Sequence, residues 1–231
     1  MSAKFYAHSI TNKSVYMKQA MKLQEFVNDD ALRSANNLFP AEYLLVIQPH
    51  EALWEEIKSI KEKFAADYSC DQARKGLPHI TLAVFKQFPS TEMYIRQSLR
   101  NNARTLSPFK IEVKDFGSFP SHTIYINIVS KVPIMNAVKT LKQNAQKFMK
   151  MDKDNKPHFI TDPHLTIARK LQPWQYEKGW LEYEHADFHG RFIAGHALLL
   201  KRKAGEYYKQ VEKFMFEGIK EEVTQAALFN L

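Results

Sequence analysis

The chain of 231 residues contains a single cysteine, Cys70. One cysteine excludes a disulfide within the chain and any metal cluster built from several cysteines. Because disulfide-dependent proteins are mostly secreted, this composition favours a reducing, intracellular compartment. Cys70 itself is expected to be inert.

Long apolar runs are also absent. No stretch approaches the roughly 20 apolar residues that a membrane-spanning helix needs. The first residues, 1–8, lack the basic-then-apolar layout of a signal peptide. Only 7 glycines and 10 prolines occur, which argues against a low-complexity linker or a disordered protein. We therefore expect a folded, soluble, cytoplasmic protein that is a monomer and does not contact a membrane.

The chain has fewer acidic than basic residues. It contains 33 Lys and Arg against 25 Asp and Glu, a formal net charge of +8 with a pI near 9.3. An excess of positive charge favours polyanionic partners such as nucleic acid or nucleotides. The alternative is that the charge only maintains solubility, because the acidic residues are interspersed and the longest basic run is 201–203.

Apolar periodicity divides the chain into short strands and helices. Alternating or continuous apolar runs predict strands, and apolar residues three or four positions apart predict helices. The expected strands are 43–48, 79–87, 109–119, 123–130, 163–170, 186–195, 197–203 and 207–216. The expected helices are 51–68, 89–103 and 132–149, with a helical or irregular piece at 174–183.

Helices mixed with antiparallel strands in this way predict an α+β fold. The order of elements repeats once, so we expect one domain, 41–216, made of two similar split β-α-β lobes at 41–130 and 131–216. Residues 1–40 are expected to form an N-terminal extension with a helix near 15–27. Residues 217–231 are expected to form a C-terminal helical tail.

Two short segments of the chain repeat one another. Residues 78–84 read Pro-His-Ile-Thr-Leu-Ala-Val, and residues 163–170 read Pro-His-Leu-Thr-Ile-Ala-Arg-Lys. Successive side chains of a strand point to opposite faces, so His79 and Thr81 share one face, as do His164 and Thr166. One such segment is explained as a half-exposed strand, since Thr favours strands. Two copies on corresponding strands of a repeat indicate a functional site.

Two histidine–threonine pairs in one cleft suit general acid–base catalysis. With a pKa near 6.5, one imidazole can be neutral while the other is protonated around neutrality. One ring takes a proton from water or a hydroxyl, and the other donates a proton to the leaving oxygen. The threonine hydroxyls suit the non-bridging oxygens of a phosphate. This chemistry needs no metal or other cofactor, and Asp162 is the carboxylate nearest the motifs.

The two segments strongly resemble the paired His-x-Thr-x motifs of the 2H phosphoesterases. The resemblance is greatest to the bacterial branch once called 2′–5′ RNA ligases and associated with RNA 2′,3′-cyclic phosphodiesterase activity. It spans about residues 43–216 and includes the run Leu-Leu-Leu-Lys-Arg-Lys-Ala-Gly-Glu-Tyr-Tyr at 198–208. The N-terminal 40 residues and the C-terminal tail depart from compact members.

The resemblance implies a bilobal, pseudo-two-fold domain with antiparallel sheets around a central groove. It implies that His79, Thr81, His164 and Thr166 line this groove and open 2′,3′-cyclic phosphate ends of RNA or nucleotides without a metal. Which histidine is the acid stays open. Two other functions also stay open: cleavage or ligation of 2′–5′ oligonucleotides, and RNA binding without turnover.

Four further residues are candidates for substrate binding. By strand alternation, Phe85 shares the face of His79. There it is expected either to stack on a base or to pack in the core, and the sequence favours both alternatives equally. Tyr125 points away from its isoleucine neighbours and lines the groove if helices cover the isoleucines. At the end of the second motif, alternation favours Lys170 as a phosphate ligand, whereas the family resemblance favours Arg169.

His185 and His189 are four residues apart, a spacing that holds zinc on a helix. The surrounding residues 188–193, Phe-His-Gly-Arg-Phe-Ile, instead favour a strand, so no metal site is expected.

Overall fold

The computed structural model describes residues 39–219 of the chain. The compact unit considered below consists, among these residues, of 41–87 and 91–219. The predicted N-terminal helix and most of the predicted C-terminal tail lie outside the described residues. The described part of the tail, 217–219, is not helical.

The unit contains nine strands and six α-helices among its described residues, in an α+β arrangement as predicted. The strands are β1 (Ala41–Ile47), β2 (Ile80–Gln87), β3 (Phe109–Phe119), β4 (Thr123–Ile128), β5 (His158–Phe159), β6 (His164–Arg169), β7 (His189–Ala194), β8 (His196–Arg202) and β9 (Lys209–Met215). The helices are α2 (Glu51–Asp67), α3 (Asp71–Arg74), α4 (Glu92–Thr105), α5 (Lys131–Lys142), α6 (Gln146–Met149) and α7 (Pro173–Tyr183), with a 3₁₀ turn at Pro89–Thr91 before α4.

The helix predicted over 132–149 is divided into α5 and α6. Asn144 lies between them with a left-handed backbone, φ +56°. Asparagine tolerates this conformation better than most residues, and a residue in it cannot continue a right-handed helix. The short helix α3 was not predicted, because four residues give too little periodicity.

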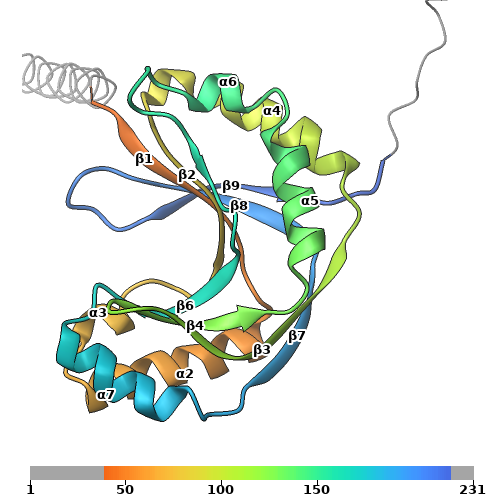
Figure 1. The fold of residues 1–231 in the computed structure, drawn as a ribbon. Helices are drawn as coiled ribbons and strands as arrows, with labels where there is room; N and C mark the ends of the chain where they lie inside the picture. Colours follow the sequence, from red (N-terminus) through yellow and green to blue (C-terminus); the bar gives the residue numbers. More distant parts are fainter. Residues whose placement is uncertain (1–38, 220–231) are drawn as a thin grey trace, which may run out of the picture. The chain divides into compact units, whose positions relative to one another are not determined.

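All strand pairs in the described sheet are antiparallel. The sheet has the order β7-β3-β4-β6-β2-β1-β8-β9, and β5 lies beside β2 off this path. Its centre is therefore the junction of β6 with β2, the two strands that contain the repeated motifs. The sheet curls as a half-barrel about this junction (Figure 1).

Helices cover one face of each half of the sheet. Helices α2, α3 and α7 lie against the half made by β7, β3, β4 and β6, whereas α4 and α6 lie with the half made by β2, β1, β8 and β9 (Figure 1). Helix α5 contacts β3 of the first half and β2 of the second. Fully buried residues from both sheet and helices, such as Ile57, Ile80, Ile95 and Leu165, form one core under this covered face. We call the opposite face of the sheet, which carries Thr81 and Thr166, the inner face.

The two halves of the sheet do not follow the two halves of the sequence. Strands β1 and β2 pair onward to β8 and β9, and β3 and β4 pair with β6 and β7. The lobes expected as 41–130 and 131–216 are therefore interleaved in space. Within residues 39–219, no helix is long and apolar enough to cross a membrane.

Candidate active site

The two repeated motifs meet at one point of the sheet, where Ile80 of β2 lies opposite Leu165 of β6. Both side chains are fully buried in the core. In an antiparallel register this pair puts His79 opposite Thr166 and Thr81 opposite His164. Side chains adjacent to a buried residue point to the other face, so both histidine–threonine pairs are directed to the inner face.

Each motif histidine is held by the same local hydrogen bond. His79 Nδ1 lies 2.6 Å from the Leu77 carbonyl oxygen, and His164 Nδ1 lies 2.9 Å from the Asp162 carbonyl oxygen. A carbonyl oxygen only accepts, so Nδ1 carries the proton in both rings. In the neutral ring this leaves a lone pair on Nε2. Both histidines thus have a defined tautomer and a free Nε2.

The proline of each motif explains why the two copies share this geometry. Pro78 and Pro163 stand between the accepting carbonyl and the histidine, and both are buried. The pyrrolidine ring fixes φ near −65° and restricts the preceding residue to extended conformations. The carbonyl two residues before each histidine is therefore presented to the ring by the sequence itself.

Positive charge surrounds His79. Burial lowers the pKa of His79 to about 4, and the cations of Lys61 and Arg169 and the ring of His164 lower it further, against the opposing effect of the Leu77 hydrogen bond. His79 is therefore neutral throughout the neutral pH range. The charges of Lys61 and Arg169 that add to this effect also favour a bound phosphate.

Lys61 was not anticipated from the sequence. It lies on α2 and is only 6% exposed, although it has no carboxylate partner among the described residues. Burial, together with the charge of Arg169, lowers its pKa to about 8. A lysine is rarely buried without a partner, because desolvating the ammonium is costly. The available signal was its spacing, four residues after Ile57 and three before Phe64, within the apolar stripe of the helix.

A β-bulge follows the threonine of each motif. In β2, Thr81 pairs with Val46 but Ala83 pairs with Leu45, which leaves Leu82 as the extra residue. In β6, Thr166 pairs with Tyr125 but Ala168 pairs with Ile124, which leaves Ile167 as the extra residue. In β2 the consecutive residues Leu82 and Ala83 are both buried, and in β6 the same holds for Ile167 and Ala168. The alternation of faces therefore reverses after each bulge.

The reversal decides which of Arg169 and Lys170 shares the inner face with the motif threonines. Arg169 lies opposite Thr123, which shares the face of Tyr125 and Thr166. Its guanidinium is also close enough to lower the pKa of His79. Lys170 ends the strand with a left-handed backbone, φ +57°, and is exposed. The structure thus brings Arg169 to the histidines, whereas the alternation argument for Lys170 is wrong because of the bulge.

The same effect changes the place of Phe85. Its side chain was expected to share the face of His79, but the bulge at Leu82 turns it to the core. Phe85 is 3% exposed and stacks on Tyr43, with ring centroids 5.1 Å apart and planes at 6°. It is a core residue and offers no surface to a base.

Tyr125 and Phe119 enclose the ring of His164. Their ring centroids lie 4.9 and 5.0 Å from that of His164, and 4.7 Å from each other. Tyr125 thus lies on the inner face, as the pattern of isoleucines suggested. Burial, with the nearby charge of Asp162, raises the pKa of its hydroxyl. Phe119 was not anticipated, because the sequence does not reveal which strand pairs with β4.

Space for Tyr125 is made by a glycine. Gly117 lies opposite Tyr125 in the β3–β4 pair. A Cβ at this position would lie 2.6 Å from the Tyr125 ring and 2.5 Å from Asn127 Oδ1. Asn127 in turn lies opposite His164 and donates to the Phe116 carbonyl at 2.7 Å. The absent side chain of Gly117 therefore sets the position of two residues beside His164.

The other half of the inner face is apolar. Leu44, Val46 and Leu198 form a separate cluster there, with Val84, Leu200 and Tyr208 packed against it. The charge of Arg169 reaches Tyr208, so this cluster lies near the cationic side of the site. The conspicuous basic pair at 201–202 is ion-paired to Glu92 and Glu42.

Comparison with known proteins agrees with this architecture. The family model of the 2'-5' RNA ligase superfamily matches residues 49–206, and no curated protein matches the sequence. Among solved structures, E. coli LigT complexed with 3'-AMP is similar with a TM-score of 0.54 and 13% identity, over 77% of this chain and 99% of LigT. TT0787 of Thermus thermophilus is similar with a TM-score of 0.50 and 17% identity, over 77% of this chain and 98% of that one. The protein therefore belongs to the 2'-5' RNA ligase superfamily, the 2H phosphoesterases, a family of phosphoesterase enzymes.

Proposed function

We propose that the protein hydrolyses 2′,3′-cyclic phosphate ends of RNA or nucleotides, with His79 and His164 as general base and acid. The observation that carries this proposal is the matched pair of Nδ1–carbonyl hydrogen bonds, which leaves Nε2 of both rings free. Two such nitrogens on one face of a sheet suit a reaction in which one proton is taken and another is given.

His79 is the better base. A general base must be unprotonated before the reaction, and the pKa of about 4 keeps His79 neutral at neutral pH. Its Nε2 lone pair takes a proton from the attacking water, whose oxygen then forms a bond to phosphorus. Nearby cations disfavour the imidazolium that results, but the bound phosphate offsets them with its own negative charge.

His164 is then the acid. Its Nε2–H donates to the ring oxygen that leaves phosphorus when one of the two P–O bonds of the cyclic phosphate breaks. The product is a phosphomonoester with a free neighbouring hydroxyl. Exchange with solvent returns His79 to the neutral form and His164 to the protonated form. The Tyr125 and Phe119 rings hold His164 in place for this transfer.

The threonines and two cations hold the phosphate between the rings. Thr81 and Thr166 are directed to the inner face beside the opposite motif's histidine, and each hydroxyl can donate to a non-bridging oxygen. Lys61 and Arg169 supply positive charge on the His79 side. Because Lys61 is buried and has no described carboxylate partner, an anionic substrate is the partner that offsets its desolvation.

A nucleoside next to this phosphate would lie against the apolar cluster that includes Val84, Leu200 and Tyr208. Aromatic and apolar side chains of this kind stack bases with little sequence preference. LigT, which has the same fold, has been crystallised with 3'-AMP, a nucleotide with its phosphate on the ribose. This ligand supports the choice of a ribonucleotide substrate.

The test is a substrate panel assayed in EDTA. It contains 2′,3′-cyclic nucleotides, RNA oligomers with a cyclic end and 2′–5′ linked oligomers. We expect turnover of the cyclic phosphates and a loss of about 10²-fold or more in His79→Ala and in His164→Ala. His185→Ala is the matched control, because His185 is 81% exposed and lies after α7.

Full activity in either motif variant would overturn the two-histidine mechanism. Turnover confined to the 2′–5′ oligomers would move the assignment to a 2′–5′ phosphodiesterase. Salt-sensitive RNA binding without any turnover, unchanged in both variants, would identify a binding module instead.

A further inference from the structure

The segment that forms α5 and α6 carries positive charge only. Residues 131–150 include five lysines and no aspartate or glutamate. Four of these lysines, Lys139, Lys142, Lys147 and Lys150, have no ion pair with a described carboxylate, whereas Lys131 pairs with Asp162 at 2.5 Å. The segment therefore presents four lysines without a direct ion pair in the described part of the chain, although the charge of Lys150 acts on Asp152.

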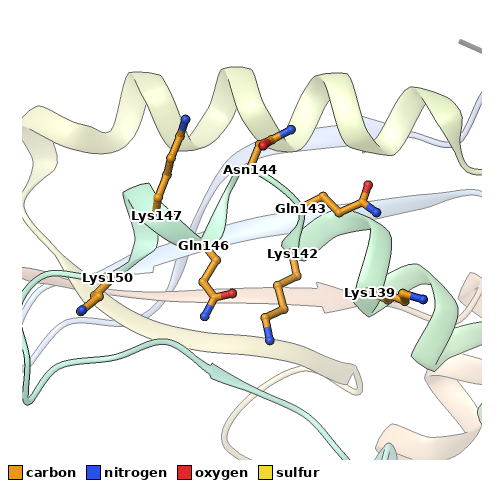
Figure 2. Close-up of a pocket in the computed structure, with 7 residues that line it drawn as sticks. All are labelled: Lys139, Lys142, Gln143, Asn144, Gln146, Lys147 and Lys150. Carbon is orange, nitrogen blue, oxygen red and sulfur yellow. The ribbon is translucent and has the colours of Figure 1, made fainter. Parts of the chain in front are cut away.

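The four lysines line one pocket of about 620 Å³, together with Gln143, Asn144 and Gln146. The break of the helix at Asn144 places the end of α5 and the turn of α6 around this hollow. Figure 2 shows the side chains of Lys142, Gln146 and Lys150 directed to the same side, away from α4, and Lys147 directed to the other side. The lining offers only cations and amides, which are ligands for anions.

Aromatic rings lie among these cations. The Lys142 ammonium is 5.1 Å from the centre of the Phe159 ring, and that of Lys147 is 4.9 Å from the Phe148 ring. Phe148 stacks on Tyr94 of α4, a residue that is 52% exposed. Cations that alternate with accessible aromatic rings are typical of surfaces that bind single-stranded nucleic acid.

The lysine pocket is joined to the candidate active site through β2. Phe159, under Lys142, lies opposite Ala83, four residues from His79. Gln87, at the far end of β2, donates to the Phe148 and Lys150 carbonyls at 2.8 and 3.3 Å. At a rise of about 3.3 Å per residue, Ala83 and Gln87 lie about 13 and 26 Å along β2 from His79, and the lysine pocket lies on the α5 and α6 side of this strand.

We propose that the lysine pocket of α5 and α6 binds the backbone phosphates of a single-stranded RNA whose 3′ end occupies the histidine pair. The inference rests on the proposed function. A 2′,3′-cyclic phosphate is by its chemistry the 3′ end of a strand, so all other nucleotides extend away from the histidines. A span of about 26 Å corresponds to about eight nucleotides at the 3.4 Å spacing of a stacked strand. The preferred substrate is then an oligonucleotide rather than a mononucleotide.

Binding without catalysis is the first measurement. The probe is a fluorescein-labelled RNA decamer with a 3′-phosphate, which holds no cyclic bond, titrated at several salt concentrations. The test variant changes Lys139, Lys142, Lys147 and Lys150 to Gln. We expect its Kd to rise about tenfold or more and the slope of log Kd against log salt to fall by about 2 to 3, at about 0.7 for each lost phosphate contact.

The matched control removes the same charge elsewhere. It changes Lys58, Lys110, Lys114 and Lys178 to Gln, four solvent-accessible lysines on α2, β3 and α7. Its Kd and salt slope should stay within about twofold of those of the unaltered protein. Equal behaviour of the two variants would overturn the proposal, and equal melting temperatures establish that both are folded.

Length dependence is the second measurement. For RNAs with a cyclic end, kcat/KM of the unaltered protein should rise about tenfold from one nucleotide to about eight, and this rise should disappear in the test variant. If kcat/KM of the test variant still rises with RNA length, the lysine pocket does not bind the strand. The proposed function is unaffected by that result. Lysine-dependent RNA binding without any turnover supports the pocket and contradicts the proposed function.

A last arm separates RNA from an anionic lipid surface. The variants are tested for sedimentation with vesicles of phosphatidylcholine containing about 30% phosphatidylserine. Vesicle binding that depends on the four lysines, with RNA binding unchanged, would overturn the proposal in favour of a membrane.

Discussion

Ile80 of β2 lies opposite Leu165 of β6, and both side chains are fully buried. This pair fixes the face of every polar residue in the two motifs. Because side chains alternate, a shift of one residue here would turn a histidine into the core and an isoleucine or leucine to the inner face. The stability of the core thereby holds the geometry of the candidate active site.

Lys61→Met is predicted to separate activity from stability. The change removes the ammonium of a buried lysine that has no described carboxylate partner, so the free energy of unfolding should stay the same or rise by about 1 kcal/mol. The phosphate loses a charged ligand worth about 1.5–3 kcal/mol, so kcat/KM should fall by about 10- to 100-fold. Steady-state kinetics and urea unfolding measure the two effects.

Lys58→Met is the control for this change, because Lys58 lies on the same helix and its side chain is 44% exposed. Its kcat/KM should not change. Two results would contradict a role of Lys61 in phosphate binding. One is full kcat/KM in Lys61→Met, and the other is a joint loss of stability and activity. Either would show that the side chain contributes only to packing.

The low pKa of His79 predicts an unusual pH dependence of activity. In a plot of kcat/KM against pH, the fall on the acid side reports the pKa of the general base in the free enzyme. With His79 as the base, the midpoint of this fall should lie near pH 4 rather than near 6.5. The pH profile for a cyclic mononucleotide measures it. An acid limb between pH 6 and 7 would contradict the assignment of His79 as the base.

The same pKa also affects folding. Between pH 6.5 and about 4 the unfolded chain binds a proton at His79 that the folded chain does not, so the free energy of unfolding falls as the pH falls, by at most about 3 kcal/mol. Above pH 6.5 the contribution is constant. We expect the free energy of unfolding, plotted against pH over this range, to have a shallower slope for His79→Gln than for the unaltered protein. Urea unfolding of both proteins at several pH values measures the two slopes.

Arg169 and Lys170 are predicted to respond differently to substitution. Arg169→Met should raise KM about tenfold or more, because the phosphate loses a cation on the inner face. Lys170→Gly should leave kcat/KM within twofold and raise the melting temperature by about 2–4 °C, because glycine adopts φ +57° without the cost that lysine carries. A higher KM in Lys170→Gly with an unchanged KM in Arg169→Met would instead identify Lys170 as the phosphate ligand.

Gly117→Ala is predicted to reduce activity in a folded protein. Its Cβ would force the Tyr125 ring and Asn127 away from their places beside His164, at a cost of about 1–3 kcal/mol. We expect kcat/KM to fall about tenfold with the secondary structure retained. Gly195→Ala is the matched control, since a Cβ at Gly195 has no neighbour within 4 Å. Equal kinetics of the two variants would refute the role of Gly117.

The sequence by itself determined the α+β class, most of the strands and helices, and the two histidine–threonine motifs. These features depend on local patterns: apolar periodicity sets the element type, and alternation sets the face of a residue within a few positions. Alternation also placed Tyr125 opposite its isoleucine neighbours, but that this face is the inner one depended on the helices that cover the isoleucines.

Only the tertiary structure decided which cations and aromatic rings surround the histidines. The two bulges exist because partner strands pair across them, so the strand's own sequence did not reveal that Phe85 turns to the core and Arg169 to the inner face. The charge of Lys61 acts on His79 because α2 packs against the half of the sheet that contains β6. Alternation is a property of one strand, whereas these placements depend on how separate strands and helices pack together.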